Sequence, residues 1–444
     1  MSGGLVMGAA PRAGSWRTPF AAGVAAIGAS QASLAIAGLV AYPFLTRHLG
    51  PGGYGSFSLL LTIWGLVYAS DVARPLLTRE QSAGDPDEAR TDLGSAALFN
   101  LVAMAGLGAV LGAIGGGGTW ALVAAVFAAI SCLASPAAAQ LAATGSPHVP
   151  IVARNVAWSV AFLLAAAVVF GGGGWAPALG CFFLARVALT LYLRSRVAGR
   201  PGVARVRWSG VAGATRVNLL DLLGFKLVLV VLATADRFVL YRLASPDVFG
   251  EYAAAFDLVI KVNVFSSAVG ALLEPALARR FGQGGTEAAG RHLLRVARWS
   301  FPAVGFVLTL LSLFSAPLLA TIAGAPFADA AHFIPILAVG VLLQFVGFLL
   351  VPWRQAVGDF RSQRQGYGVA AVAALVAGLL LVPVWGAYGA AAAYLVARVG
   401  DLWILRRSWS ELRPAGGVGW REMTGFVLSL VGIVGAGWMG VGVW

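Results

Sequence analysis

The chain has 444 residues, of which 59% are hydrophobic and only 11% are charged, and its mean hydropathy is +0.83. A soluble domain of this length does not need so apolar a composition to build a core, so we predict an integral membrane protein. The net charge of +13 and the pI near 10.6 do not indicate nucleic-acid binding, because the arginines form neither a basic face nor an arm interleaved with aromatic residues.

The first half of the chain predicts one six-helix bundle. Residues 1–19 are expected to be a cytoplasmic tail, since Arg12 and Arg17 precede an apolar run too long for the core of a signal peptide. Six runs long enough to cross a membrane then predict an N-terminal lobe over residues 20–193. They lie near 20–45, 54–73, 93–114, 119–141, 151–172 and 174–193.

The second half repeats this pattern after an arginine-rich stretch, residues 194–216, which we predict to be a cytoplasmic linker. Six more apolar runs predict a C-terminal lobe over residues 217–405. They lie near 217–240, 250–274, 297–320, 330–352, 366–384 and 386–405. Residues 406–444 hold a basic connector and a thirteenth apolar run, 422–443, for which the sequence leaves open whether it spans the membrane. The predicted fold is therefore all-α, with two parallel six-helix transmembrane bundles and an extra C-terminal helix.

The distribution of positive charge predicts the orientation. The N-terminal tail and every second connector hold 24 of the 31 lysines and arginines, whereas the intervening connectors and adjoining helix ends hold only Arg47, Arg237 and Arg242. Short cytoplasmic loops carry the excess of Lys and Arg in membrane proteins. The N-terminus is therefore expected to be cytoplasmic.

The only two lysines of the chain, Lys226 and Lys261, lie deep in consecutive apolar runs. Each is about ten residues from the start of its run, which places it near mid-bilayer at a rise of about 1.5 Å per residue. A cation at that depth is costly unless it faces a water-filled cavity or a partner, so both are candidate substrate ligands. The alternative is local pairing, because Asp221 lies near Lys226 and Asp257 precedes Lys261 by one helical turn.

Two arginines within predicted spans, Arg186 and Arg398, are weaker candidates for the same role. Asp401 follows Arg398 by one turn, which favours a structural ion pair there. Arg186 has no acidic residue near it in the sequence, and its long side chain could instead extend toward the basic end of its span.

Carboxylates near the lysines have two interpretations. Asp221, Asp236 and Asp257 could hold the ammonium groups in place, or they could take up protons if the protein is an ion-coupled transporter.

Enzymatic sites are not predicted. The four histidines show no metal-ligand spacing, and no nucleotide-binding phosphate loop occurs. Residues 435–440 formally fit a dinucleotide-binding glycine pattern, but they lie in an apolar run, where close helix packing explains the glycines better. We therefore predict no catalytic residue, no metal and no cofactor.

An internal repeat relates the two halves. Residues 47–57 (RHLGPGGYGSF) match residues 242–252 (RLASPDVFGEY) without gaps, at a constant offset of 195 residues. Chance similarity of two turns is the alternative. Both copies link the first and second spans of a six-span set, so we expect parallel repeats with the substrate path at their interface, near the membrane midplane.

Three segments together resemble Wzx-type polysaccharide flippases of the multidrug/oligosaccharidyl-lipid/polysaccharide exporter superfamily. These are Leu45–Phe57, Asp236–Arg242 with Phe249–Ala253, and Glu274–Arg279. The resemblance implies a V-shaped transporter that moves undecaprenyl-pyrophosphate-linked oligosaccharide across the bacterial inner membrane, beside glycosyltransferases and a polysaccharide polymerase. By position, Lys226 and Lys261 match the basic residues that such flippases present to the pyrophosphate, with Arg186 and Arg398 as weaker matches.

Two other functions remain open. A proton- or sodium-coupled exporter of small cationic compounds predicts an acidic cavity, yet the first span has no acidic residue between Ala21 and Tyr42. A membrane glycan polymerase or ligase predicts a large outer loop, whereas the longest outward connector, near 242–250, has about nine residues.

Overall fold

The computed structural model describes residues 17–69, 148–197, 231–356, 360–412 and 420–442, together with a few positions between 106 and 229. Helices account for nearly all of these described residues, and none of them forms a strand. The all-α prediction is confirmed. The predicted spans near 93–114 and 119–141 and most of the linker 194–216 lie outside the described residues.

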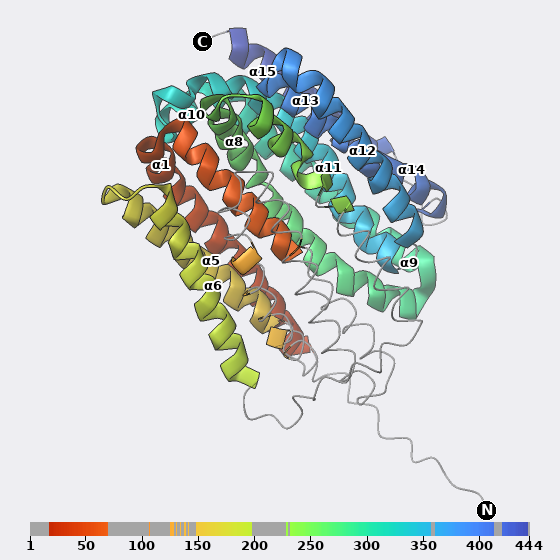
Figure 1. The fold of residues 1–444 in the computed structure, drawn as a ribbon. Helices are drawn as coiled ribbons and strands as arrows, with labels where there is room; N and C mark the ends of the chain where they lie inside the picture. The colour runs from red at the N-terminus through yellow and green to blue at the C-terminus, as the bar shows by residue number, and fades with distance from the viewer. Residues whose placement is uncertain are drawn as a thin grey trace, which may run out of the picture.

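Three long helices represent the N-terminal half. They are α1 (Arg17–Ala69), α5 (His148–Phe170) and α6 (Trp175–Val197), and α5 packs against both α1 and α6 (Figure 1). The first helix contains two predicted spans joined at Gly50, whose φ of 66° and ψ of 176° are not helical. Glycine tolerates that backbone conformation without a steric penalty, so the chain turns there with almost no connector.

The C-terminal half begins with a helix over residues 231–243. It continues with α8 (Pro246–Ile260), α9 (Asn263–Leu313), α10 (Ser315–Ile322), the 3₁₀ helix η2 (Ala325–Phe333), α11 (Ile334–Ala356), α12 (Phe360–Trp385), α13 (Ala387–Ala397), α14 (Val399–Leu412) and α15 (Trp420–Gly442). Figure 1 shows these elements, in green to blue, beside α1, α5 and α6. In the following, the seam is the interface between α1, α5 and α6 on one side and residues 231–442 on the other.

Two predicted spans are interrupted. The span near 250–274 breaks at Lys261 and Val262, between α8 and α9, and the span near 386–405 breaks at Arg398, between α13 and α14. Ser245 caps the start of α8 by accepting a hydrogen bond from the backbone of Val248, and Pro246 occupies the first turn, where its missing N–H costs nothing.

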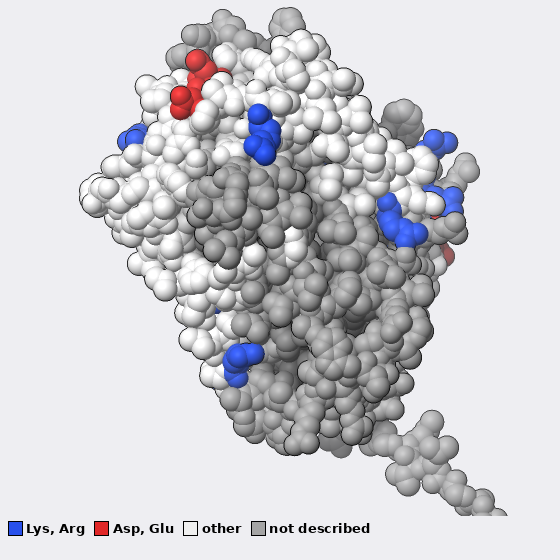
Figure 2. Space-filling model, viewed as in Figure 1, with Lys and Arg blue, Asp and Glu red and all other residues white. Residues whose placement is uncertain are grey.

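The surface of the described helices is apolar. Figure 2 shows that most of the described face carries neither Lys, Arg, Asp nor Glu. Large aliphatic side chains point outward, for example Val384 at 73% and Leu184 at 68% exposure. Six described helical segments have the length and hydropathy needed to cross a bilayer. A surface of this kind requires lipid around it, as an integral membrane protein has.

The C-terminal run that the sequence left open forms α15, which packs along α9 and α11. The packing depends on small residues. A side chain on Gly305 of α9 would overlap Ser429 of α15, and one on Gly432 would lie 2.9 Å from the hydroxyl of Thr309. Small residues allow helix backbones to approach closely in membrane proteins, so α15 belongs to the C-terminal bundle.

Candidate functional site

The two copies of the repeated sequence lie against each other at one end of the seam. A Cβ added to Gly55 would lie 3.1 Å from the Cα of Gly250, and a Cβ on Gly250 would overlap the carbonyl of Pro51. The same contact brings Gly52 against Asp247. We call this packing of residues 47–57 on residues 242–252 the motif contact. Because it leaves no room for side chains at its centre, it closes that end of the seam.

Hydrogen bonds extend the closure along the seam between α1 and α8. The hydroxyls of Tyr54 and Ser58 donate to the carboxylate of Asp257 at 2.9 and 2.8 Å. The buried hydroxyl of Tyr42 donates to the carbonyl of Ala254 at 2.9 Å. Each of these bonds joins the two halves, so any opening of the seam at this end must break them.

A third polar residue of α1 joins this set. Thr62 follows Ser58 by one turn and accepts a hydrogen bond from the guanidinium of Arg237. Residues 54, 58 and 62 therefore form one polar face of α1 that is turned toward the C-terminal half. We call the bonds of these three residues to Asp257 and Arg237 the seam bonds.

Lys261 lies at the same seam, where α8 ends. Its ammonium is 5.1 Å from the ring centroid of Phe162 on α5, and a Cβ on Gly38 of α1 would lie 2.9 Å from its Nζ. The side chain is half-buried. Within the described part of the chain, Lys261 makes neither an ion pair nor a hydrogen bond. Asp257 lies within electrostatic reach of Lys261 but forms no ion pair with it at contact distance, and its carboxylate accepts from Tyr54 and Ser58.

The backbone at Lys261 stays helical but is locally tightened. Lys261 and Val262 keep right-handed helical angles, and the carbonyls of Leu258 and Val259 accept hydrogen bonds from them at a spacing of three residues. The aromatic face of Phe162 adds a weak attraction for the ammonium. Lys261 thus combines a charge without an ion-pair partner among the described residues with a location between the halves.

Asp236, Arg398 and Asp401 form a buried network in the C-terminal half, which Arg237 joins to the seam bonds. Asp236 accepts a hydrogen bond of 2.5 Å from Tyr252, and its neighbour Arg237 lies 4.0 Å from the ring centroid of Phe256. Asp236 also lies within electrostatic reach of Arg398. The four charges of Asp236, Arg237, Arg398 and Asp401 sum to zero, which is what allows them to be buried together.

Arg398 pairs locally, in the way its spacing favoured. Its guanidinium lies 3.5 Å from Asp401, whose other carboxylate oxygen accepts a hydrogen bond of 2.9 Å from Tyr367. The ring of Tyr394 lies 4.8 Å from the guanidinium carbon. A side chain on Gly347 would overlap Asp401, so this glycine makes the space for the pair. Arg398 is therefore engaged by protein groups in this structure.

We expect Asp401→Ala to lower the free energy of unfolding by about 3 kcal/mol, because it leaves the guanidinium of Arg398 buried without its carboxylate. The side chains of this pair are 4% and 3% exposed. Glu287→Ala is the matched control, since it breaks the exposed pair with Arg291 and should cost less than about 1 kcal/mol. Unfolding of the purified protein in mixed detergent and SDS measures both. Equal losses of unfolding free energy in the two variants would contradict the role of Asp401 as the buried partner of Arg398.

The remaining predicted residues are placed only in part. Arg186 is 4% exposed in α6, which excludes an extended side chain reaching the membrane surface. Lys226 and Asp221 lie outside the described residues. Sequence reasoning missed Tyr54, Ser58 and Arg237 as seam residues. It assigned Arg237 to a helix end, whereas the structure places it within the helix over 231–243, bonded to α1.

No protein-family model and no curated protein sequence matches the chain. Solved structures do. The lipid II flippase MurJ, in an inward closed conformation, aligns with a TM-score of 0.70 at 10% identity, covering 92% of this chain and 97% of MurJ. The chain therefore shares its fold with MurJ over almost its whole length.

Two further structures agree in fold. An outward-facing multidrug resistance transporter of the MATE family aligns with a TM-score of 0.55 at 14% identity, over 93% of this chain and 96% of its own. A transporter of the MOP superfamily from Pyrococcus furiosus, described as having a binding pocket of reversed polarity, aligns with a TM-score of 0.52 at 13% identity, over 93% and 98%. The shared fold covers almost the whole chain in each case.

Metal chemistry finds no support in the described residues, where no three His, Cys, Asp or Glu side chains are grouped closely enough to hold an ion. The site can instead offer one ammonium and polar groups on both sides of a seam that closes at one end. This arrangement can attract an anion and respond to it by changing the contact between the halves.

Proposed function

We propose that the protein is a flippase that moves undecaprenyl-pyrophosphate-linked oligosaccharide from the cytoplasmic to the outer leaflet of the bacterial inner membrane by alternating access. One observation carries the proposal: the ammonium of Lys261 lies at the seam between the halves, without an ion-pair partner among the described residues. The fold shared with the lipid II flippase MurJ supports it, since that protein also handles a lipid-linked substrate.

The chemistry of Lys261 suits a pyrophosphate headgroup. Such a group carries at least two negative charges and strong acceptor oxygens, and an ammonium attracts it as a point charge without demanding one fixed geometry. That property favours transient binding, which a transporter needs because it must also release its substrate. Lys226, the second lysine of the predicted site, would supply a further charge, and Arg186 would be a weaker contributor.

Depth in the membrane agrees with this role. Lys261 follows Gly250 by eleven residues of α8, which places it about 16 Å along the helix from the motif contact. That distance is about half of the 30 Å thickness of the hydrocarbon core. In the orientation predicted from the arginines, the motif contact closes the outer side of the protein. Lys261 then lies near the membrane midplane, where it can bind a headgroup that enters from the cytoplasmic side.

The seam bonds supply a means of alternation. Asp257 is the acceptor for two hydroxyls of α1, so its proposed role is to hold the outer side closed, with proton uptake as a way of weakening that hold. Asp236 and Asp221 are the remaining candidates for ion coupling. Opening outward requires these bonds to break and α1 to move away from α8.

The alternative is a cation-coupled exporter of small molecules, and the shared fold with MATE transporters is the observation that favours it. The polarity of the seam argues against it, because the ammonium of Lys261 would repel a cationic substrate. In the flippase proposal, glycosyltransferases and a polysaccharide polymerase act before and after this protein as its partners, and no cofactor is required.

Transport by the purified full-length protein tests whether it is a flippase or a cation-coupled exporter. Proteoliposomes are loaded with a fluorescent polyprenyl-pyrophosphate oligosaccharide, and its arrival in the opposite leaflet is detected by an added glycosidase. We expect rapid translocation of this lipid and no uptake of ethidium, a small organic cation, under an imposed proton or sodium gradient. Ethidium transport without lipid translocation would establish the alternative and overturn the proposal.

A further inference from the structure

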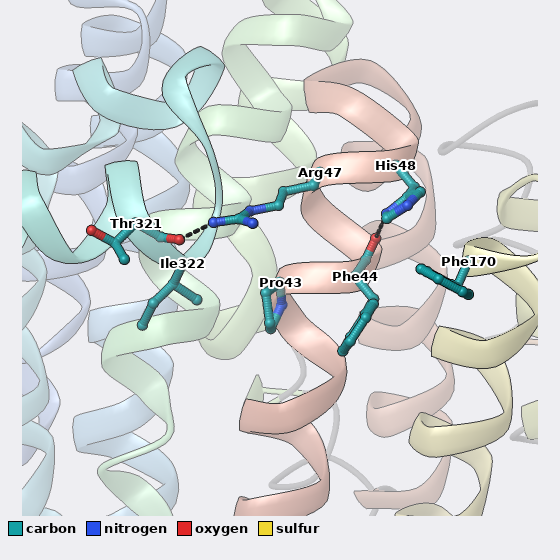
Figure 3. Close-up of a pocket in the computed structure, with 7 residues that line it drawn as sticks. All are labelled: Pro43, Phe44, Arg47, His48, Phe170, Thr321 and Ile322. Atoms are coloured by element: carbon teal, nitrogen blue, oxygen red, sulfur yellow. Dashed lines mark hydrogen bonds between the residues drawn. The ribbon is translucent and has the colours of Figure 1, made fainter.

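A second candidate site lies beside the motif contact, on the lateral surface of the molecule. It is a pocket of about 450 Å³ between α1, the end of α5 and α10 (Figure 3). Its lining consists of Pro43, Phe44, Arg47, His48, Phe170, Thr321 and Ile322. The first five belong to the N-terminal half and the last two to the C-terminal half, so the pocket crosses the seam.

Two exposed basic residues of the same turn of α1 line this pocket, Arg47 on the side of α10 and His48 on the side of Phe170 (Figure 3). Arg47 reaches across the seam and donates to the carbonyl of Thr321 through one of its terminal nitrogens. Because a guanidinium has five N–H groups, most of its donors remain for a ligand. His48 donates through Nδ1 to the carbonyl of Phe44 at 3.0 Å, so its Nε2 can donate to a phosphate only when the ring is protonated. None of the seven lining residues is acidic.

Aromatic side chains form the other wall. Phe170 is 66% exposed, and its ring lies 5.9 Å from that of Phe44 and 5.7 Å from that of His48. A site for a soluble anion gains nothing from exposed phenyl rings. A ligand with a charged head and an apolar body gains from both, because the head meets the guanidinium of Arg47 while the body covers the rings.

The repeat contains the basic pair in its first copy only. At the offset of 195 residues, Arg47 corresponds to Arg242 and His48 to Leu243. Arg242 is exposed, as Arg47 is, but the second basic residue is missing, because Leu243 is an exposed aliphatic side chain. The duplicated segment has therefore kept one arginine at both places and gained a basic pair at one.

We infer that this pocket binds the phosphate headgroup of an anionic phospholipid, with Arg47 and His48 as its ligands and with the acyl chains along Phe44 and Phe170. Because Thr321 and Ile322 line the pocket from the opposite half, a lipid that fills it contacts both halves and stabilises the arrangement in which the motif contact is closed. That the bound phospholipid lies in the outer leaflet rests on the proposed orientation and function of the protein. The binding of a phospholipid to this pocket does not rest on them.

Native mass spectrometry of the purified full-length protein with phosphatidylglycerol tests the inference without any transport assay. We expect one phosphatidylglycerol to bind tightly, and we expect Arg47→Ala combined with His48→Ala to weaken that binding at least tenfold, because two charge-assisted hydrogen bonds are lost. Ile322→Glu, which keeps both basic residues but adds an opposing charge, should weaken it similarly. Arg242→Ala is the matched control and should have no effect.

Two outcomes would overturn the inference. An equal loss of phosphatidylglycerol binding in Arg242→Ala would mean that the lipid is attracted only by the overall positive charge at this end of the seam. Displacement of phosphatidylglycerol by millimolar glycerol 3-phosphate would mean that the pocket takes a soluble phosphate and not a lipid.

Discussion

We expect Gly250→Ala to reduce transport at least tenfold while the protein remains folded in the membrane. The added Cβ would overlap the carbonyl of Pro51, so the two copies of the repeated sequence cannot approach as they do in the structure. Overpacking of this kind costs about 1–3 kcal/mol, and that cost falls on the closed state alone, because the contact exists only there. The closed state should therefore lose about ten- to a hundredfold in population relative to the open one.

A measured distance between the two halves shows whether transport is lost because the closed state is less populated. Spin labels at Phe170→Cys and Trp385→Cys, both exposed positions, report the separation of the halves in a protein otherwise free of cysteine. We expect a longer distance in Gly250→Ala than in the parent. Gly180→Ala is the control, because a Cβ there meets no other atom within 4 Å. An unchanged distance in Gly250→Ala, together with normal transport, would show that the motif contact does not act as a gate.

We expect Lys261→Met to reduce transport of the proposed lipid-linked oligosaccharide about ten- to a hundredfold. Methionine keeps an unbranched side chain against Phe162 and Gly38 but removes the charge, and a hydrogen bond from a charged group to phosphate contributes about 1.5–3 kcal/mol. Because a half-buried cation is removed, stability should stay the same or rise. The rate in proteoliposomes and the thermal unfolding midpoint of the same preparations measure the two quantities.

Lys261→Arg serves as the charge-preserving control and should retain most of the transport. Lys226→Met, which alters the second predicted lysine, should resemble Lys261→Met. If Lys261→Met transported at the rate of the parent protein, the ammonium would have no role in binding. If it lost transport and stability together, Lys261 would be a structural residue.

The sequence predicted the helices well but not their interruptions. Hydropathy identified the runs near 151–172, 174–193 and 366–384, which correspond to α5, α6 and α12. It could not reveal that the run near 250–274 breaks at Lys261. Hydropathy measures composition, whereas an interruption depends on which backbone hydrogen bonds are formed, and here those bonds shift to a tighter pattern around Lys261 and Val262.

Local pairs were predictable and distant ones were not. The spacing of Arg398 and Asp401 places them one turn apart, and they meet in the structure. The same argument applied to Asp257 and Lys261, yet Asp257 bonds to Tyr54 and Ser58, about 200 residues away in sequence. A signal existed, because residues 54, 58 and 62 are polar positions four residues apart in an apolar span, but the spacing does not identify their partner.

The repeat was visible in the sequence, but its consequence was not. A constant offset of 195 residues predicts that the two halves are repeats, and says nothing of whether the matching segments touch. Parallel repeats around a common axis bring equivalent positions together only where they lie close to that axis. Gly55 and Gly250 do so, and the lack of a side chain at both positions has its physical reason in that contact.

The most direct test of the account is equilibrium binding of a short-chain polyprenyl pyrophosphate to the purified protein, with the matching uncharged polyprenol as competitor. We predict that the pyrophosphate binds, that the polyprenol does not displace it at equal concentration, and that Lys261→Met weakens the binding at least tenfold. Equal affinity for the pyrophosphate and the polyprenol, or equal affinity of Lys261→Met and the parent protein for the pyrophosphate, would contradict the claim that Lys261 recognises an anionic headgroup.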